Sequence, residues 1–262
     1  MTRISKTFDQ LKARQKKAFI PYIMAGDPDR DATLERVLLL ERCGADIIEL
    51  GVPFSDPLAD GPTIQKAAAR ALAAGVSLSN VLSIVKTLRR QTQIPLVLMT
   101  YYNPVFKYGE ESFVRDAIEA GVDGVIIPDL PPEEAGSILK FSRSGKGKGG
   151  LDTIFLAAPT STEDRMKRIV SASSGFVYYV SITGITGSKL ALDGAFRSHI
   201  AALRRLTDKP VAVGFGVSTP DDARVVGEVA DGVIVGSAIV KKFYEDPEKA
   251  EQFIRELREA IS

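Results

Sequence analysis

The chain has almost none of the residues that build disulfides and zinc sites. Its 262 residues include one cysteine, Cys43, one histidine, His199, and no tryptophan. A single cysteine excludes an internal disulfide, and these two residues are too few for a Cys/His metal centre. Carboxylates stay available for Mg²⁺ or Ca²⁺. Cys43 ends an apolar helical run, so we expect it to be a small buried residue.

An excess of one charge and long apolar runs are also missing. Thirty-four Lys and Arg against 33 Asp and Glu leave a net charge of +1, which argues against a nucleic-acid or membrane partner. No apolar run reaches the roughly 18 residues of a membrane span, and MTRISKTFDQLKARQKKAF lacks an apolar signal core. We expect a cytoplasmic protein; a plastid protein with its transit peptide removed is the alternative.

What the chain does contain is a series of short apolar or β-branched runs. Their hydrophobicity is nearly continuous, as expected for parallel strands covered on both faces. Helical periodicity fills the stretches between them, and Thr219-Pro220-Asp221-Asp222 has the cap, proline and acids of a helix start. The runs are 18–26, 46–52, 96–103, 124–130, 152–159, 176–182, 211–216 and 232–238.

Strand and helix alternate eight times along these 262 residues. This predicts an α/β fold, a single (β/α)8 TIM barrel, with an extra N-terminal helix and a short extra helix after strand 8. A doubly wound open sheet is the alternative, but no GxGxxG follows the first strand. No linker divides the chain, so we expect residues 1–262 to form one catalytic domain, with the glycine-rich stretch 142–150 as a solvated loop.

Two carboxylates stand near the expected end of the second strand, where active sites of such barrels lie. Glu49 has apolar neighbours, which would raise its pKa and suit it to proton transfer near neutral pH; an ion pair with Lys or Arg is the alternative. Asp60 precedes a helix and could instead be a cap or an Asx turn.

Glycines follow the last two strands, as Gly214-Phe215-Gly216 and Gly236-Ser237. Backbone N–H groups and a helix N-terminus there would suit a phosphate, although tight turns alone could require the glycines. After the sixth strand, residues 183–187 could form a loop that closes over a ligand. Tyr178 and Tyr179 should face opposite sides of their strand, one toward the interior, unless both serve core packing.

These motifs together resemble one family, the alpha chain of tryptophan synthase. The resemblance runs from AFIPYIMAGDP through ELGVPFSDPLADGPTIQ, MTYYNPVF, GVIIPDLP, IFLAAPTST, VYYVSITGITG and VGFGVSTP to IVGSAIVK. It implies a lyase that cleaves indole-3-glycerol phosphate to indole and glyceraldehyde 3-phosphate in a reverse aldol reaction, with no metal and no organic cofactor.

The resemblance also implies residue roles. Glu49 would be the acid/base at indole C3 and the side-chain hydroxyl, and Asp60 would accept the indole N–H and stabilise developing positive charge. Substrate would be bound by Tyr22, where family members often have Phe, and by Ile64, Met99, Ile126, Ile154, Tyr178 and Thr186. Phosphate would be bound by Gly187, Gly214, Phe215, Gly216, Gly236 and Ser237.

The family's partner is a beta chain that carries pyridoxal phosphate and receives indole through a tunnel, usually in an α2β2 heterotetramer. Asp56, Pro57, Asn103 and Pro104 match positions at that interface. Two departures stand out: the glycine-rich connection 142–150 is longer than expected, and Lys189 replaces a common Arg. A stand-alone lyase that releases free indole, another phosphate-binding barrel and a non-catalytic partner are the alternatives.

Overall fold

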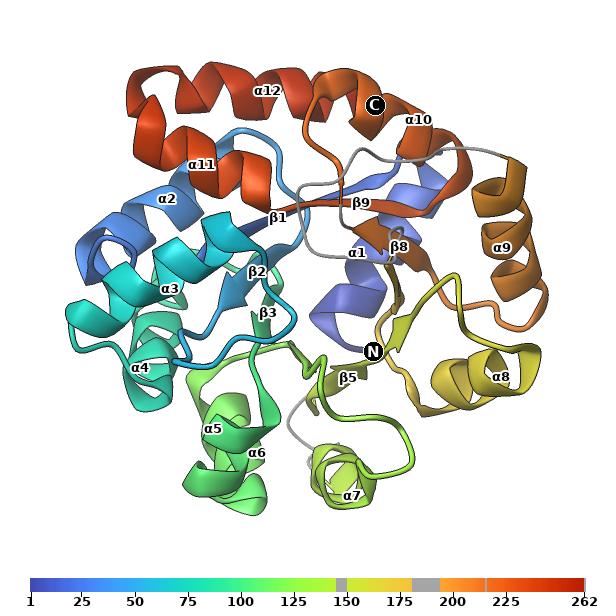
Figure 1. Cartoon of the computed structure of the whole chain (residues 1–262), viewed down its shortest axis with the longest axis horizontal. Helices are drawn as coiled ribbons and strands as arrows, with labels where there is room; N and C mark the ends of the chain where they lie inside the picture. The colour runs from blue at the N-terminus through green and yellow to red at the C-terminus, as the bar shows by residue number, and fades with distance from the viewer. Residues whose placement is uncertain (145–149, 181–193, 215, 262) are drawn as a thin grey trace.

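Parallel strands form the centre of the computed structural model, which describes residues 1–144, 150–180, 194–214 and 216–261 (Figure 1). They follow the order β5-β4-β3-β2-β1-β9-β8-β7-β6. Because β5 and β6 are two halves of one predicted strand, separated by Phe155, the order closes an eight-membered barrel. The strands are β1 (Ala18–Met24), β2 (Ile48–Gly51), β3 (Leu96–Met99), β4 (Gly124–Ile126), β5 (Asp152–Ile154), β6 (Leu156–Ala157), β7 (Val177–Val180), β8 (Val211–Gly214) and β9 (Gly232–Val235).

Helices surround the barrel and confirm the predicted (β/α)8 order (Figure 1). The extra N-terminal helix is α1, and the short extra helix after the last strand is α11. The helices are α1 (Arg3–Ala13), α2 (Arg30–Arg42), α3 (Pro62–Ala73), α4 (Leu78–Leu88), α5 (Tyr102–Tyr108), α6 (Glu110–Ala120), α7 (Gly136–Ser144), α8 (Glu163–Ala172), α9 (Gly194–Arg205), α10 (Pro220–Val229), α11 (Ser237–Glu245), the 3₁₀ turn Pro247–Lys249 and α12 (Ala250–Ile261).

Several predicted strands are longer than the observed ones, and the run 96–103 shows the physical reason. The run 96–103 was expected to be extended throughout, but β3 ends at Met99 and α5 begins at Tyr102. The Tyr102 N–H donates to Asp129 Oδ1 at 2.8 Å, and Pro104 lies in the first turn of α5, where a missing N–H costs nothing. The aromatic run that suggested a strand is therefore divided between a strand and a helix.

Alternation along the strands separates two buried faces. Ile48 and Leu50 pack in the large outer cluster that includes residues of α2, α4 and α6. A second, interior cluster is formed by every other strand residue and by α1. It contains Ile4, Phe8, Leu11, Ala18, Ile20, Ile47, Val97, Ile126, Ile154, Phe176, Tyr178, Ala212 and Ile234.

Aspartates at the strand starts hold the amino end of the barrel. Three of them accept the N–H of a residue on the neighbouring strand: Asp46 from Phe19, Asp123 from Leu96, and Asp231 from Val211. Asp123 also pairs with Arg3 and Arg89. These contacts lie opposite the strand ends where catalysis is expected, so they serve stability.

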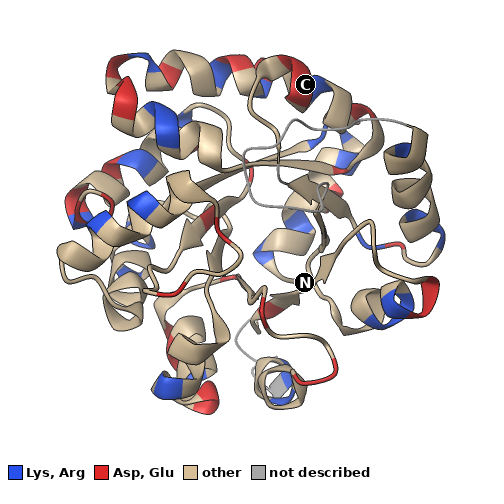
Figure 2. Ribbon diagram, in the orientation of Figure 1, with Lys and Arg blue, Asp and Glu red and all other residues tan. Residues whose placement is uncertain are grey.

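Charges of both signs are interspersed over the outer helices in the view of Figure 2. No single helix in the described part of the chain is long and apolar enough to cross a membrane; α3 and α4 would meet that test only together, and they are bent by 91°.

Candidate active site

Glu49 points into the barrel at the carboxyl end of β2. Its neighbour two residues earlier, Ile47, belongs to the interior cluster, and alternation puts both side chains on that face. Glu49 is 1% exposed, and its Oε1 has no hydrogen-bond partner in the described part of the chain. Burial raises its pKa to about 8. At neutral pH this carboxyl group is a neutral acid that can donate a proton.

Two buried phenols flank Glu49. Tyr22 is its register partner on β1, and Tyr178 lies in the interior cluster on β7. The pKa of each phenol is raised well above its usual range, mainly by burial and then by nearby carboxylates, Asp60 first for Tyr22 and Glu49 first for Tyr178. Tyr179 faces outward instead and contacts Phe196 of α9 edge-on. Both phenols inside the barrel therefore stay protonated beside the two carboxyl groups.

Asp60 lies in the loop between β2 and α3. Burial raises its pKa to about 6, while a hydrogen bond from the Tyr101 hydroxyl opposes that shift. The N-cap of α3 is Gly61, and no side chain caps this helix. The structure thus removes the capping explanation for Asp60 and leaves a partly buried carboxylate beside Tyr22.

Tyr101 is a site residue that the sequence reasoning missed. It follows β3, is 6% exposed, and its hydroxyl accepts from the Ala59 N–H at 3.0 Å. The same hydroxyl donates to Asp60. Its place just after the apolar run, in MTYYN, is a usable signal, but the aromatic residues there also fit a continuous strand.

Apolar residues end three neighbouring strands of the barrel. Strand register puts Met99 beside Ile126, and Ile126 beside Ile154. Ile64 of α3 packs in a small cluster with Tyr22. Three of the four residues that the resemblance predicted for an apolar slot are thus register neighbours on β3, β4 and β5, and the fourth packs with Tyr22; their role in holding an aromatic ring stays a prediction.

The N-terminus of α11 offers donors at the same end of the barrel. Gly236 is its N-cap, Ser237 is its first residue, and no side chain caps it. A Cβ built on Gly236 would lie 3.6 Å from the Tyr22 Cβ, so this helix end adjoins the aromatic slot. Gly214 ends β8, and Gly216 has a φ of +79°, which favours glycine. First-turn N–H groups lack helical partners and suit an anion.

Some predicted residues lie outside the described part of the chain. They are Thr186 and Gly187 of the sixth loop, together with Lys189, and Phe215.

The residues predicted for a partner interface are at the surface beside the site. Asp56 is exposed and Pro57 half-buried in the loop after β2, while Asn103 and Pro104 lie in the first turn of α5. Two apolar side chains near them are strongly exposed, Leu58 at 92% and Phe106 at 63%.

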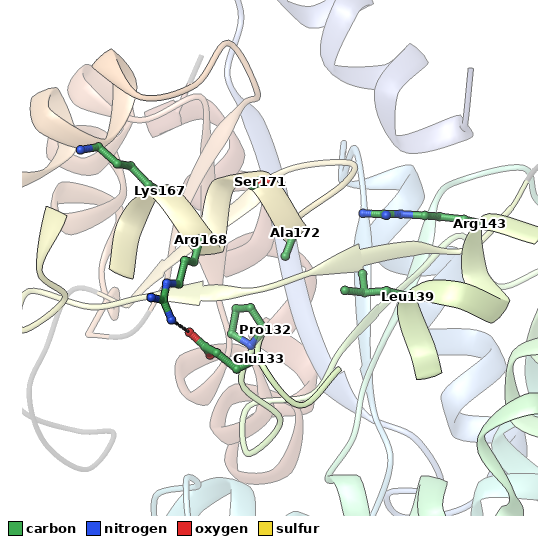
Figure 3. A pocket seen from close by; sticks show the side chains of 8 residues that line it. All are labelled: Pro132, Glu133, Leu139, Arg143, Lys167, Arg168, Ser171 and Ala172. Carbon is green, nitrogen blue, oxygen red and sulfur yellow. Dashed lines mark hydrogen bonds and ion pairs between the residues drawn. The ribbon is translucent and has the colours of Figure 1, made fainter. Parts of the chain in front are cut away.

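A cavity of about 460 Å³ lies between α7 and α8 (Figure 3). Two of its cations are already paired, Lys167 with Glu163 at 2.7 Å and Arg168 with Glu133 at 3.4 Å. None of the predicted site residues that the structure describes lines it. Its lining residues are Pro132, Glu133, Leu139, Arg143, Lys167, Arg168, Ser171 and Ala172.

The carboxylates of the chain do not gather into a metal site in the part that the structure describes. Among residues 1–144, 150–180, 194–214 and 216–261, no three His, Cys, Asp or Glu side chains are arranged to hold a metal ion.

Comparison with known proteins gives one consistent result. The model of the family "Tryptophan synthase alpha chain" matches residues 8–262. The tryptophan synthase alpha chain of Geotalea daltonii is 51% identical over 243 residues, covering 93% of this chain and 90% of that protein. That of Geobacter sulfurreducens is 50% identical over 266 residues, covering 100% and 99%.

Solved structures agree with the sequence relatives. The alpha subunit of Legionella pneumophila tryptophan synthase has a TM-score of 0.89 at 40% identity and covers 100% of this chain and 98% of its own. A chain of Mycobacterium tuberculosis tryptophan synthase has a TM-score of 0.91 at 39% identity and covers 99% and 98%. A family model over nearly the whole chain and relatives at about half identity leave one assignment: the chain belongs to the tryptophan synthase alpha chain family.

Proposed function

We propose that Glu49 carries out the proton transfers of this family's reaction and that Asp60 stabilises the positive charge that develops on the indole ring. The chain is a carbon–carbon lyase of tryptophan biosynthesis, and its reaction is the retro-aldol cleavage of indole-3-glycerol phosphate to indole and glyceraldehyde 3-phosphate. The observation that carries the division of roles is a pair of carboxyl groups at one barrel mouth with unequal environments, one with a pKa of about 8 and one of about 6.

Glu49 supplies the proton that lets the carbon–carbon bond break. As a neutral acid it protonates indole C3, which makes the ring a better leaving group. The carboxylate left behind then takes the proton of the glycerol hydroxyl as the aldehyde forms. Burial without a hydrogen-bond partner for Oε1 suits both steps, because it favours the neutral form before reaction and a strong base after the first transfer.

Asp60 stabilises the ring nitrogen. Protonation at C3 makes this nitrogen iminium-like, so its N–H becomes a stronger donor and carries positive charge. With a pKa of about 6, Asp60 is mostly ionised at neutral pH and can accept from that N–H. The Tyr101 hydroxyl holds Asp60 in place by a hydrogen bond.

The phosphate of the substrate is held at the N-terminus of α11, with Gly236 and Ser237 as backbone donors, and by the glycines after β8. We expect Gly236→Glu to raise KM at least about tenfold, or about 1.4 kcal/mol, because the new carboxylate would repel the phosphate. Initial rates of indole formation against substrate concentration measure this.

The matched control is Gly236→Ala, whose Cβ would make an ordinary 3.6 Å contact with Tyr22 and should raise KM much less than the glutamate. A Gly236→Glu enzyme with unchanged KM would contradict phosphate binding at this helix end.

The described residues also support cofactor-free chemistry, because protonation, base and iminium stabilisation are all available from Glu49 and Asp60. Pyridoxal phosphate then belongs to the partner beta chain, and a cytoplasmic location suits this soluble substrate.

Partnership with a beta chain follows from the family; an α2β2 heterotetramer is the finer proposal. Exposed Leu58 and Phe106 beside Asp56 and Asn103 supply an apolar patch for that contact.

Indole release from indole-3-glycerol phosphate, with and without a beta chain, tests this function. We expect slow release by the isolated chain and a many-fold rise when the beta chain is added. A fast isolated chain that the beta chain does not accelerate would favour the stand-alone lyase, and no release in either case would refute the proposed activity.

A further inference from the structure

Asp27 is a buried carboxylate at the barrel mouth that the proposed mechanism does not use. It lies three residues after the end of β1 and is 3% exposed. Arg70 binds it with both ends of its guanidinium, Nε to Oδ1 at 2.6 Å and Nη2 to Oδ2 at 2.7 Å. This two-bond geometry fixes orientation as well as distance. The end of β1 and helix α3 are therefore locked together.

Arg70 lies on α3, which begins two residues after Asp60. It is eight residues beyond Pro62, the first residue of α3, or about 12 Å along the axis at 1.5 Å per residue. A tilt or slide of α3 would move the loop end that carries Asp60. Since Arg70 is tied to the barrel wall, the ion pair limits both movements.

The same ion pair contacts α11, whose N-terminus we assign to phosphate. The Arg70 guanidinium stacks over the ring of Tyr244 at 4.1 Å. Arg36 donates to the Asp27 carbonyl oxygen and stacks over Phe243 at 4.8 Å. Both arginines that bind Asp27 thus rest on neighbouring aromatic residues of α11.

We propose that Asp27 and Arg70 are positioning residues that set Asp60 relative to the phosphate-binding helix α11. The proposal rests on the function proposed above for Asp60 and α11. Three elements meet at this one pair: the end of β1, the helix behind Asp60, and the helix that would bind phosphate. A displacement of about 1 Å at a catalytic group can cost up to 100-fold in rate, so a pair remote from the reacting atoms can control turnover.

A merely structural ion pair would behave differently, and the chain provides one for comparison. Asp123 is 5% exposed and is bound by Arg89 at 2.5 Å and Arg3 at 2.9 Å, but it lies at the opposite end of the barrel. Loss of either buried pair should lower Tm, because a charge is left uncompensated. Loss of the Asp27 pair alone should also impair turnover.

The experiment measures kcat, KM and Tm in the complex with a beta chain. We expect Asp27→Asn to lower kcat roughly tenfold with KM changed less than about threefold, and Asp123→Asn to lower Tm with kcat changed less than about twofold. In an Asp60→Asn background, Asp27→Asn should have little further effect on kcat, because its action passes through Asp60. Equal losses in both backgrounds would overturn the proposal.

Two further measurements keep the test decisive. If Asp27→Asn does not fold, Arg70→Lys keeps a cation but loses the two-bond fork, and it should lower kcat with the same dependence on Asp60. If the Asp60→Asn rate is too low to measure, the acid limb of the pH profile of kcat/KM replaces it. That limb should move to higher pH in Arg70→Lys, as Asp60 loses its hydrogen bond from Tyr101, and an unmoved limb would overturn the proposal.

The outcome also separates this proposal from the one on which it rests. Normal turnover of Asp60→Asn alone would refute the role of Asp60. A large loss in Asp60→Asn together with normal turnover in Asp27→Asn and Arg70→Lys would refute only the positioning pair.

Discussion

Glu49→Gln should lower the rate of indole formation by about 10²–10⁴-fold, the range for loss of a general acid–base group, while substrate binding stays nearly unchanged. Glutamine keeps the size and the polarity of the side chain but cannot donate a proton to C3. Three observations support this acid–base role of Glu49: it is 1% exposed, its Oε1 has no hydrogen-bond partner in the described part of the chain, and its pKa is about 8.

Single-turnover indole release and equilibrium binding of the substrate measure the two effects separately, because KM alone mixes binding with chemistry. The matched control is Glu41→Gln on the outer helix α2. Glu41 accepts from Thr92 at 2.7 Å and takes no part in the site, so its turnover should be normal. Turnover of Glu49→Gln close to wild type would refute the role of Glu49.

Sequence alone was sufficient to predict the barrel. Continuous apolar runs and helical periods are local patterns, and eight repeats of them leave few arrangements. The error at 96–103 was also local: an aromatic run fits a strand by propensity, but tertiary contacts such as that of Asp129 with the Tyr102 N–H decide the helix start.

The site was only partly predictable for the same reason. Position placed Glu49 and Asp60 at the reactive end but left the direction of Glu49 and a capping role of Asp60 open. The direction of Glu49 is known only once Ile47, two residues earlier, is located in the interior cluster. The capping role of Asp60 is excluded only once Gly61 is identified as the N-cap of α3. The Tyr101 hydrogen bond and the Asp27–Arg70 pair join distant segments, and no local pattern contains them.

Glu49 should also cost the protein stability, and the cost should depend on pH. Its pKa is about 8 in the folded protein against a usual value of 4.5. Below pH 4.5 the carboxyl group is protonated in both states. Between pH 4.5 and 8 the unfolded chain loses this proton and the folded chain keeps it, so the contribution of Glu49 to the free energy of unfolding falls by about 1.4 kcal/mol per pH unit.

Glu49→Gln removes this dependence. We compare the free energy of unfolding of the variant with that of the wild type. Taking the difference at pH 4 as the reference, this difference should shift in favour of the variant as pH rises, by several kcal/mol at pH 8, and should stay constant above that pH. Urea unfolding of both proteins between pH 4 and 9 measures the difference.

Two other carboxylates provide controls of known direction. Asp60→Asn should show a smaller gain that ends near pH 6, its folded pKa, because Asp60 is only partly buried. For Asp222 the pH dependence has the opposite sign. Despite partial burial, hydrogen bonds from Ser218 and Thr219 hold its pKa below the usual value. Asp222→Asn should therefore lower the free energy of unfolding at neutral pH, and lower it less in acid. If the difference in free energy of unfolding between Glu49→Gln and the wild type did not change with pH, Glu49 would not be a buried, neutral carboxyl group.

The two Glu49 predictions have opposite signs and one cause. Burial without a partner makes the carboxyl group a usable acid at neutral pH, and the same burial disfavours its ionised form in the folded protein. A catalytic group that costs stability is expected where function needs an unfavourable environment. A variant that is both inactive and more stable at pH 8 would therefore support one explanation for both effects, whereas loss of activity without a stability gain would place the role of Glu49 in geometry rather than in its raised pKa.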